Sequence, residues 1–166
     1  MKAHTNDLVA SAKCELAGEV LRSFDNLRFS ATGWSMSPTV WSGDTLVVER
    51  VSSDRFRVGD IALVGREGRL CAHRVVSLAQ GSGNPFWITQ GDAMATPDRP
   101  VIESELLGRV TELIRLGKSM AVSSKLSAIE RLVAQIVRRS AFAARVFVYM
   151  ISKFRTQTES RLPCQG

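Results

Sequence analysis

Histidine is scarce in this chain of 166 residues, which contains only His4 and His73. A mechanism that needs an imidazole base therefore has two candidates, and His4 belongs to a chain start that we expect to fray. Cysteine is also sparse and odd in number, and no CxxC pair occurs among Cys14, Cys71 and Cys164. A zinc knuckle is not expected, and neither is any other metal or cofactor. One disulfide is possible, but free thiols in a reducing compartment are favoured.

Long apolar runs are missing as well. Charged residues interrupt residues 1–30 at short intervals, which excludes the apolar region of a signal peptide: Asp7, Lys13, Glu15, Glu19 and Arg22. The apolar stretch 141–151 contains Arg145 and is far shorter than the ~20 residues that span a bilayer. With no transmembrane helix expected, we predict a protein that is cytoplasmic or peripheral at the membrane.

The positive charge of the chain is confined to its C-terminal part. Residues 1–117 hold 13 Lys/Arg and 14 Asp/Glu, whereas residues 118–166 hold 9 Lys/Arg and 2 Asp/Glu. The two parts therefore carry net charges of −1 and +7. A basic patch of this kind indicates an anionic partner for the C-terminal part alone, and nucleic acid is not expected as a partner of the whole chain.

The hydrophobic pattern predicts an α+β fold in three segments. Residues 1–26 form an N-terminal helix whose main apolar stripe is Leu8, Leu16, Val20 and Phe24, with Ala17 and Leu21 beside it. Residues 27–117 form a mainly antiparallel β core, with strands at 27–31, 45–51, 60–65, 70–76, 86–89 and 107–114. Residues 118–166 form a basic tail with an amphipathic helical segment at 124–154, whose polar side carries Arg131, Arg138, Arg139 and Arg145.

One stretch of the core, Gly33-Trp34-Ser35-Met36-Ser37-Pro38, predicts an exposed nucleophile. Glycine before Ser35 allows a close backbone approach or a positive φ, and Pro38 keeps a helix from running through the turn. Such a turn can expose a hydroxyl and direct backbone N–H groups at an oxyanion. Taken alone, however, a serine in such a turn is far more often an ordinary turn residue than a nucleophile.

A base and two acids follow the serine in sequence. His73 lies in a strand where alternation puts Cys71, His73 and Val75 on one face. It is either a core histidine with satisfied hydrogen bonds or a general base. Asp92 and Asp98 lie in a turn-rich loop, and either could fix the tautomer of the imidazole. Asp92 could instead be a third Gly-Asp turn, and Asp98 a solvated carboxylate.

Taken together, these stretches resemble the signal peptidase I and LexA-type serine peptidases. Residues 33–48 look like the serine box, 58–64 like the next strand, 73–76 like the general-base box, and 91–98 like the acidic box. Residues 107–110 look like the strand that closes the core. A histidine at the position of His73 is similar to the endoplasmic-reticulum, archaeal and sporulation-type enzymes, whereas the bacterial leader peptidases carry a lysine there.

The resemblance implies a signal-peptidase-like β core and a role for each residue. Ser35 would be the nucleophile, His73 the base and Asp98 the third member, with Asp92 supporting or sharing that role. Met36 and Pro38 would shape the turn and the substrate groove. Many signal peptidases carry an oxyanion-stabilising serine at the position of Gly33 and a glycine at that of Trp34. The oxyanion hole is therefore expected to use backbone N–H groups, notably that of Ser35.

Two functions are compatible with these residues. The first is a serine endopeptidase that cleaves a leader peptide or proprotein, with small side chains near the cut. The alternative is a non-catalytic module on the same fold that binds a peptide or a membrane. The tail would meet an anionic membrane through its arginines or would pack on protein. Signal peptidases usually have a transmembrane anchor ahead of the serine box, and none is expected here.

Overall fold

The computed structural model describes residues 2–80 and 85–122. The predicted helical segment at 124–154, with its four arginines, lies outside the described residues. One helix, α1 (Lys2–Phe24), precedes a set of strands: β1 (Asn26–Ser30), β2 (Thr45–Glu49), β3 (Ile61–Arg66), β4 (Arg69–Gln80), β5 (Pro85–Gln90), β6 (Val101–Ile102), β7 (Leu106–Arg115) and β8 (Lys118–Ala121). Short 3-10 turns occur at Ser53–Arg55 and Glu103–Glu105. The fold is α+β, as predicted.

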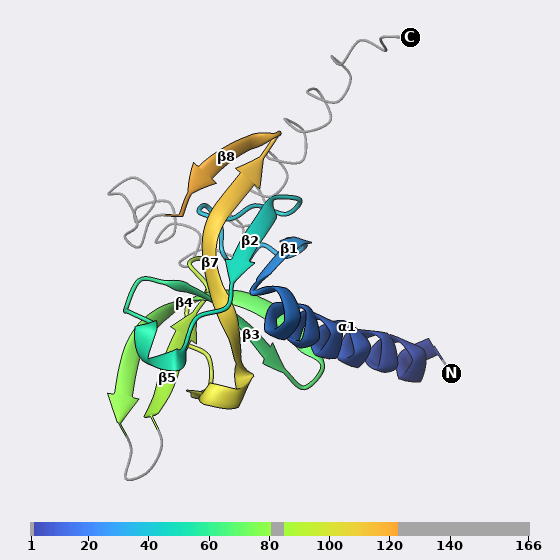
Figure 1. Ribbon diagram of the computed structural model, residues 1–166, viewed down its shortest axis with the longest axis horizontal. Helices are drawn as coiled ribbons and strands as arrows, with labels where there is room; N and C mark the ends of the chain where they lie inside the picture. The colour runs from blue at the N-terminus through green and yellow to red at the C-terminus, as the bar shows by residue number, and fades with distance from the viewer. Residues whose placement is uncertain (1, 81–84, 123–166) are drawn as a thin grey trace.

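All strand pairs are antiparallel and belong to one sheet, in the order β1-β2-β7-β3-β4-β5-β6, with β8 added to β7. Figure 1 shows β7 running through the middle of the molecule, with α1 on one side and the β4–β5 hairpin reaching out on the other. Register shifts occur in β2 at Val47/Val48, in β3 at Leu63/Val64 and in β4 at Val75/Ser77. Such irregularities bend strands, which suits a sheet that curls.

Alternation along the strands creates two apolar clusters on the two faces of the sheet. The first cluster contains Leu46, Leu63 and Val110 and receives Met36 and Leu21 from outside the sheet. The second cluster is built from the following buried residues: Phe56, Ala62, Val64, Val75, Trp87 and Val101. Because β3 contributes to both clusters, it reads as a continuous apolar run in the sequence.

Helix α1 packs on the sheet through the residues predicted beside its main apolar stripe more than through the stripe itself. Ala17 and Leu21 are buried, whereas Leu16 and Phe24 of the predicted stripe are 63% and 69% exposed. The helix approaches closely at Gly65, where an added Cβ would lie 2.7 Å from Cys14 Sγ. Small residues thus decide which face of α1 meets the sheet, and they leave larger apolar side chains in the open. In the part of the chain that the structure describes, no helix is both long enough and apolar enough to cross a membrane.

The sheet continues past the predicted end of the core at residue 117. Leu116 and Gly117 form a turn with positive φ values of 50° and 74°, and Lys118–Ala121 then pairs back onto β7. Val122 donates a backbone hydrogen bond to Thr111 O and packs against the first cluster. The start of the basic tail at 118 was therefore placed too early, because the turn at Gly117 reverses a strand instead of ending the core.

Candidate active site

Ser35, His73 and Asp98 meet in one hydrogen-bonded row. His73 Nε2 lies 2.9 Å from Ser35 Oγ, and His73 Nδ1 lies 2.6 Å from Asp98 Oδ2. With the ring proton on Nδ1, that N–H donates to the carboxylate, and the Ser35 hydroxyl donates to Nε2. The separations along the chain are 38 and 25 residues, so the fold brings together groups that the sequence only places in order.

Each member of the row is held by a different element. His73 projects from β4 and is buried, whereas Ser35 lies in the turn that follows β1. Asp98 follows β5, and its N–H donates to Thr89 O at 2.8 Å. The Thr89 hydroxyl donates to Asp98 Oδ2 at 2.7 Å. The carboxylate oxygen that faces the imidazole is therefore fixed by a second donor on the neighbouring strand.

The electrostatics of the row favour a charged imidazole. Burial alone lowers the pKa of His73, but its hydrogen bond to Asp98, followed by Cys71 and the Asp98 charge, raises it from 6.5 to about 10. Burial raises the pKa of Asp98, yet the hydrogen bonds from His73 and Thr89 outweigh it and lower that pKa below the ordinary value. Both shifts favour an imidazolium beside a carboxylate, and only the neutral ring can accept the proton of Ser35.

Asp92 takes a different position from Asp98. Its two carboxylate oxygens accept hydrogen bonds from Arg74 Nε and Nη2, both at 2.8 Å, and both side chains are buried. Arg74 also donates to Gly59 O at 2.7 Å. Of the two acids predicted for the site, Asp98 contacts His73. Asp92 instead forms a bidentate ion pair with Arg74, the residue that follows His73 in β4.

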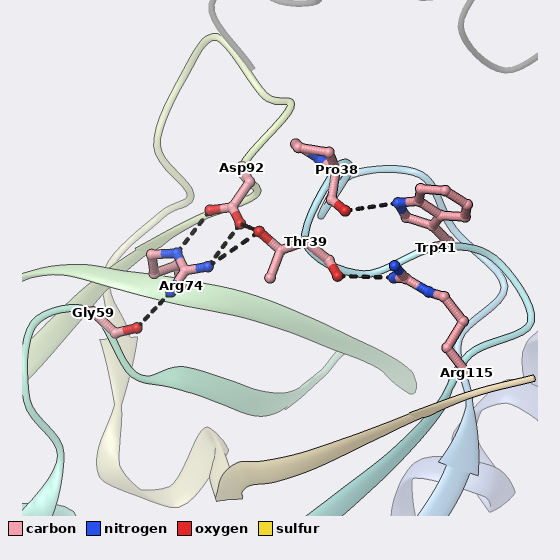
Figure 2. A network of polar contacts seen from close by, with 7 residues as sticks. All are labelled: Pro38, Thr39, Trp41, Gly59, Arg74, Asp92 and Arg115. Atoms are coloured by element: carbon pink, nitrogen blue, oxygen red, sulfur yellow. Dashed lines mark hydrogen bonds and ion pairs between the residues drawn. The ribbon is translucent and has the colours of Figure 1, made fainter. Parts of the chain in front are cut away.

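Two arginines hold the loop that carries Ser35, and Thr39 connects them (Figure 2). The Thr39 hydroxyl donates to Asp92 Oδ2 at 2.6 Å, and the Thr39 carbonyl accepts from Arg115 Nη2 at 3.0 Å. Arg115 also binds both oxygens of Asp44, at 3.0 and 2.6 Å. Its guanidinium lies 4.2 Å from the centre of the Trp41 ring. The serine loop is thus fixed to β4 through Arg74 and to β7 through Arg115.

The residues predicted to shape the turn have distinct roles. Met36 is buried in the first apolar cluster, and Pro38 O accepts a hydrogen bond from Trp41 Nε1 at 2.7 Å. Trp34 O accepts from Ser37 N at 3.1 Å. At Gly33 an added Cβ would meet nothing within 4 Å and φ is not positive, so neither a contact within the described chain nor the backbone geometry requires a glycine there.

The glycine that the site does require is Gly91. A Cβ at this residue would lie 2.6 Å from Ser35 O. The same carbonyl accepts a hydrogen bond from Ala93 N at 2.8 Å. The acidic loop therefore presses directly against the nucleophile turn, which explains a glycine before Asp92.

Sequence reasoning missed the arginines and Thr39, although a clue was present. Arg74 is followed by Val75 and Val76 in a predicted strand, and a charge buried there needs a partner. Each Gly-Asp aspartate has an arginine neighbour: Asp44 with Arg115 at 2.6 Å, Asp60 with Arg109 at 3.6 Å, and Asp92 with Arg74 at 2.8 Å. No sequence spacing connects these partners, since Arg115 and Asp44 are 71 residues apart.

A hollow of about 630 Å³ opens at Ser35. It lies between α1 and the face of the sheet that carries the first apolar cluster. Its lining includes Leu16, Phe29, Leu70 and Ala72. A second hollow of about 470 Å³, beside Asp25 and Arg50, includes none of the three residues of the row. The hydroxyl of Ser35 is therefore next to a mainly apolar space of the size that peptides and small ligands occupy.

Comparison with family models and with curated proteins gave no match for this chain.

Proposed function

We propose that the protein is a serine endopeptidase that cleaves a leader peptide or proprotein through an acyl-enzyme. The observation that carries this proposal is the row Ser35–His73–Asp98, with contacts of 2.9 and 2.6 Å. A serine within reach of an imidazole that a carboxylate orients is the arrangement used for nucleophilic attack on a carbonyl. The sequence likeness to signal-peptidase-like enzymes supports the same reaction.

The chemistry follows from the positions of these groups. The neutral form of His73 accepts the Ser35 proton on Nε2 while Oγ bonds to the carbonyl carbon of the scissile peptide. His73 then gives that proton to the leaving amine, and the C–N bond breaks. Water attacks the resulting ester with His73 again as base, which frees the new carboxylate and restores Ser35. Asp98 stabilises the imidazolium that each step creates.

The oxyanion is expected to be stabilised by the backbone. Among the hydrogen bonds of the described residues, none uses the N–H of Ser35, so this group is available to a developing negative charge. The side chain of Asp92 is occupied by Arg74 and Thr39. Its role in the reaction is therefore to hold the serine loop in place, at one step removed from the reacting atoms.

An extended peptide is the substrate that suits the strands around Ser35. In the part of the chain that the structure describes, β1 pairs only with β2, and residues 69–73 of β4 pair only with β3. Both strands line the hollow at Ser35, so each presents a free edge there. A peptide can pair with such edges through its own backbone, which places a carbonyl at the nucleophile.

The alternative function is a non-catalytic module that binds a peptide or membrane partner. It predicts no requirement for a reactive hydroxyl, and it would be favoured if Ser35 and His73 stood too far apart to interact. The 2.9 Å contact between Oγ and Nε2 weighs against it. A chemical test of the hydroxyl separates the two functions without knowledge of the natural substrate.

The test is covalent labelling with a fluorophosphonate, which reacts with activated serines. We expect one adduct on Ser35, located by mass spectrometry of the digested protein, and loss of labelling in Ser35→Ala and His73→Ala because the nucleophile or its base is removed. Ser37→Ala is the matched control, since Ser37 lies two residues away and its buried hydroxyl has no hydrogen-bond partner in the described structure. Unchanged labelling in Ser35→Ala would refute the peptidase.

A further inference from the structure

The hollow at Ser35 has a wall that comes from outside the sheet. Lys13, Leu16, Ala17 and Val20 of α1 line one side of it. The lining also includes Leu27 and Phe29, which are alternate residues of β1 and therefore point the same way, and Ala31, which follows the strand and packs on the same apolar cluster. Helix α1 leans on this face without covering it, so an apolar channel remains between the helix and the sheet.

The exposure of Leu16 is the unusual feature of this channel. Its side chain is 63% exposed, although Ala17 beside it is 5% exposed. Phe24 of the same helix is 69% exposed but does not line the channel. Leu16 therefore borders apolar surface that the fold leaves open, and Phe24 provides a comparison of similar exposure on the same helix.

A peptide side chain is the occupant that fits best. The channel is bounded by the free edges of β1 and β4. A peptide backbone can form hydrogen bonds with such edges, whereas an acyl chain has no groups to do so. The channel also continues to Ser35, so a peptide that binds in it reaches the nucleophile. The charged residues in the lining are Lys13 and Arg69, both basic and both exposed, which disfavours basic side chains in the occupant.

We infer that α1 forms the outer wall of a substrate subsite that takes a large apolar side chain at a distance from the scissile bond. Leu27 is four residues from Ala31, and a strand rises ~3.3 Å per residue. In a peptide extended along β1, the residue whose large apolar side chain lies beside Leu27 is thus about four residues from the peptide residue that lies beside Ala31. The inference rests on the proposed peptidase function and assigns Leu16 and Val20 as specificity-determining residues.

The experiment measures peptide binding in the full chain with Ser35→Ala, so that no cleavage is needed. The probes are two fluorescein-labelled peptide amides, Leu-Leu-Leu-Leu-Ala-Ala-Ala and the version with serines in place of the leucines. We expect fluorescence polarisation to show clearly tighter binding of the leucine peptide. Adding Leu16→Arg should weaken that binding about tenfold, because the apolar wall becomes charged. Phe24→Arg should leave it unchanged.

The outcomes distinguish this inference from the proposed function. Equal affinity for the two peptides, or equal losses in Leu16→Arg and Phe24→Arg, would overturn the subsite even if fluorophosphonate labels Ser35 in the unmodified chain. If neither peptide bound but laurate bound saturably, the channel would be assigned to an acyl chain, and the peptide subsite would be overturned too. Selective binding of the leucine peptide without labelling of Ser35 would support the subsite and refute the peptidase.

Discussion

Asp98 decides the protonation of the base. It accepts hydrogen bonds from both His73 and Thr89 on the same oxygen, so its negative charge is concentrated beside the imidazole. Burial lowers the pKa of His73, but the hydrogen bond to Asp98, followed by Cys71 and the Asp98 charge, raises it to about 10. The fraction of His73 that is neutral therefore grows as pH rises from 7, and only the neutral ring can accept the Ser35 proton.

The rate of fluorophosphonate labelling is expected to increase with pH well into the alkaline range. In Asp98→Asn the charge that raises the pKa is gone and burial then lowers it, so the rising limb should move to lower pH. The maximum rate should fall about a thousandfold, because an amide no longer enforces the reactive tautomer. The measurement is the second-order labelling rate from pH 5 to 10, which spans the ordinary pKa of about 6.5 and the raised one.

Thr89→Val is the control for this prediction. Threonine and valine are similar in shape, and the substitution removes one of the hydrogen bonds that lower the pKa of Asp98. The carboxylate stays in place and remains charged above its pKa, so the rising limb should stay alkaline and the rate should fall far less than in Asp98→Asn. Coincident pH profiles for the unmodified chain and Asp98→Asn would show that Asp98 does not set the pKa of the base.

At the scale of elements, the serine loop is a separate part that must be held against the sheet. The residues between β1 and β2 carry Ser35, Thr39, Trp41 and Asp44. Arg115 at the end of β7 binds the last three of these at once, through a carbonyl, an aromatic face and a buried carboxylate. The position of Ser35 Oγ relative to His73 therefore depends on an arginine whose hydrogen bonds in the described structure go to Asp44 and Thr39.

Arg115→Met is expected to lower the free energy of unfolding by about 3 kcal/mol, since it leaves Asp44 buried without its ion partner. The matched variant is Arg115→Met with Asp44→Asn, which also removes the stranded charge and should recover most of the loss. Urea denaturation measures both. Labelling of Ser35 should remain slow in the double variant, because the loop stays unclamped; full recovery of both stability and labelling would show that Arg115 does not position the serine.

The elements show what local pattern can and cannot predict. Period-2 alternation and Gly/Asp turns located strands β1 to β5 and β7 within a few residues, because these signals are local. They missed β6, with only Val101 and Ile102, and β8, whose four residues are all exposed. On α1, Ala17 and Leu21, predicted beside the main apolar stripe, are more buried than Leu16 and Phe24 of the stripe itself. The resemblance to the serine peptidases selected Ser35, His73 and Asp98, but the Arg74 and Arg115 pairs depend on sheet register.

At the scale of the whole molecule, charge divides the chain where the described structure ends. Residues 1–122 hold 14 Lys/Arg and 14 Asp/Glu, whereas residues 123–166 hold 8 Lys/Arg and 2 Asp/Glu. The part that holds the candidate site is thus neutral overall, and the net charge of +6 belongs to the rest. The candidate site therefore belongs to a part of the sequence with no net charge, and any attraction to an anionic surface would come from residues 123–166.

We propose that the basic segment binds anionic membranes, and the full chain should sediment with phosphatidylglycerol vesicles but not with phosphatidylcholine alone. Each basic residue near such a surface contributes about 1 kcal/mol. Replacing Arg131, Arg138, Arg139 and Arg145 by glutamine, which lowers the net charge from +6 to +2, should therefore weaken binding at least about a hundredfold. High salt should mimic the variant by screening, while labelling of Ser35 in solution stays unchanged because the variant leaves Ser35, His73 and Asp98 intact. Equal vesicle binding by the two chains would refute a membrane role for the arginines and favour a protein contact.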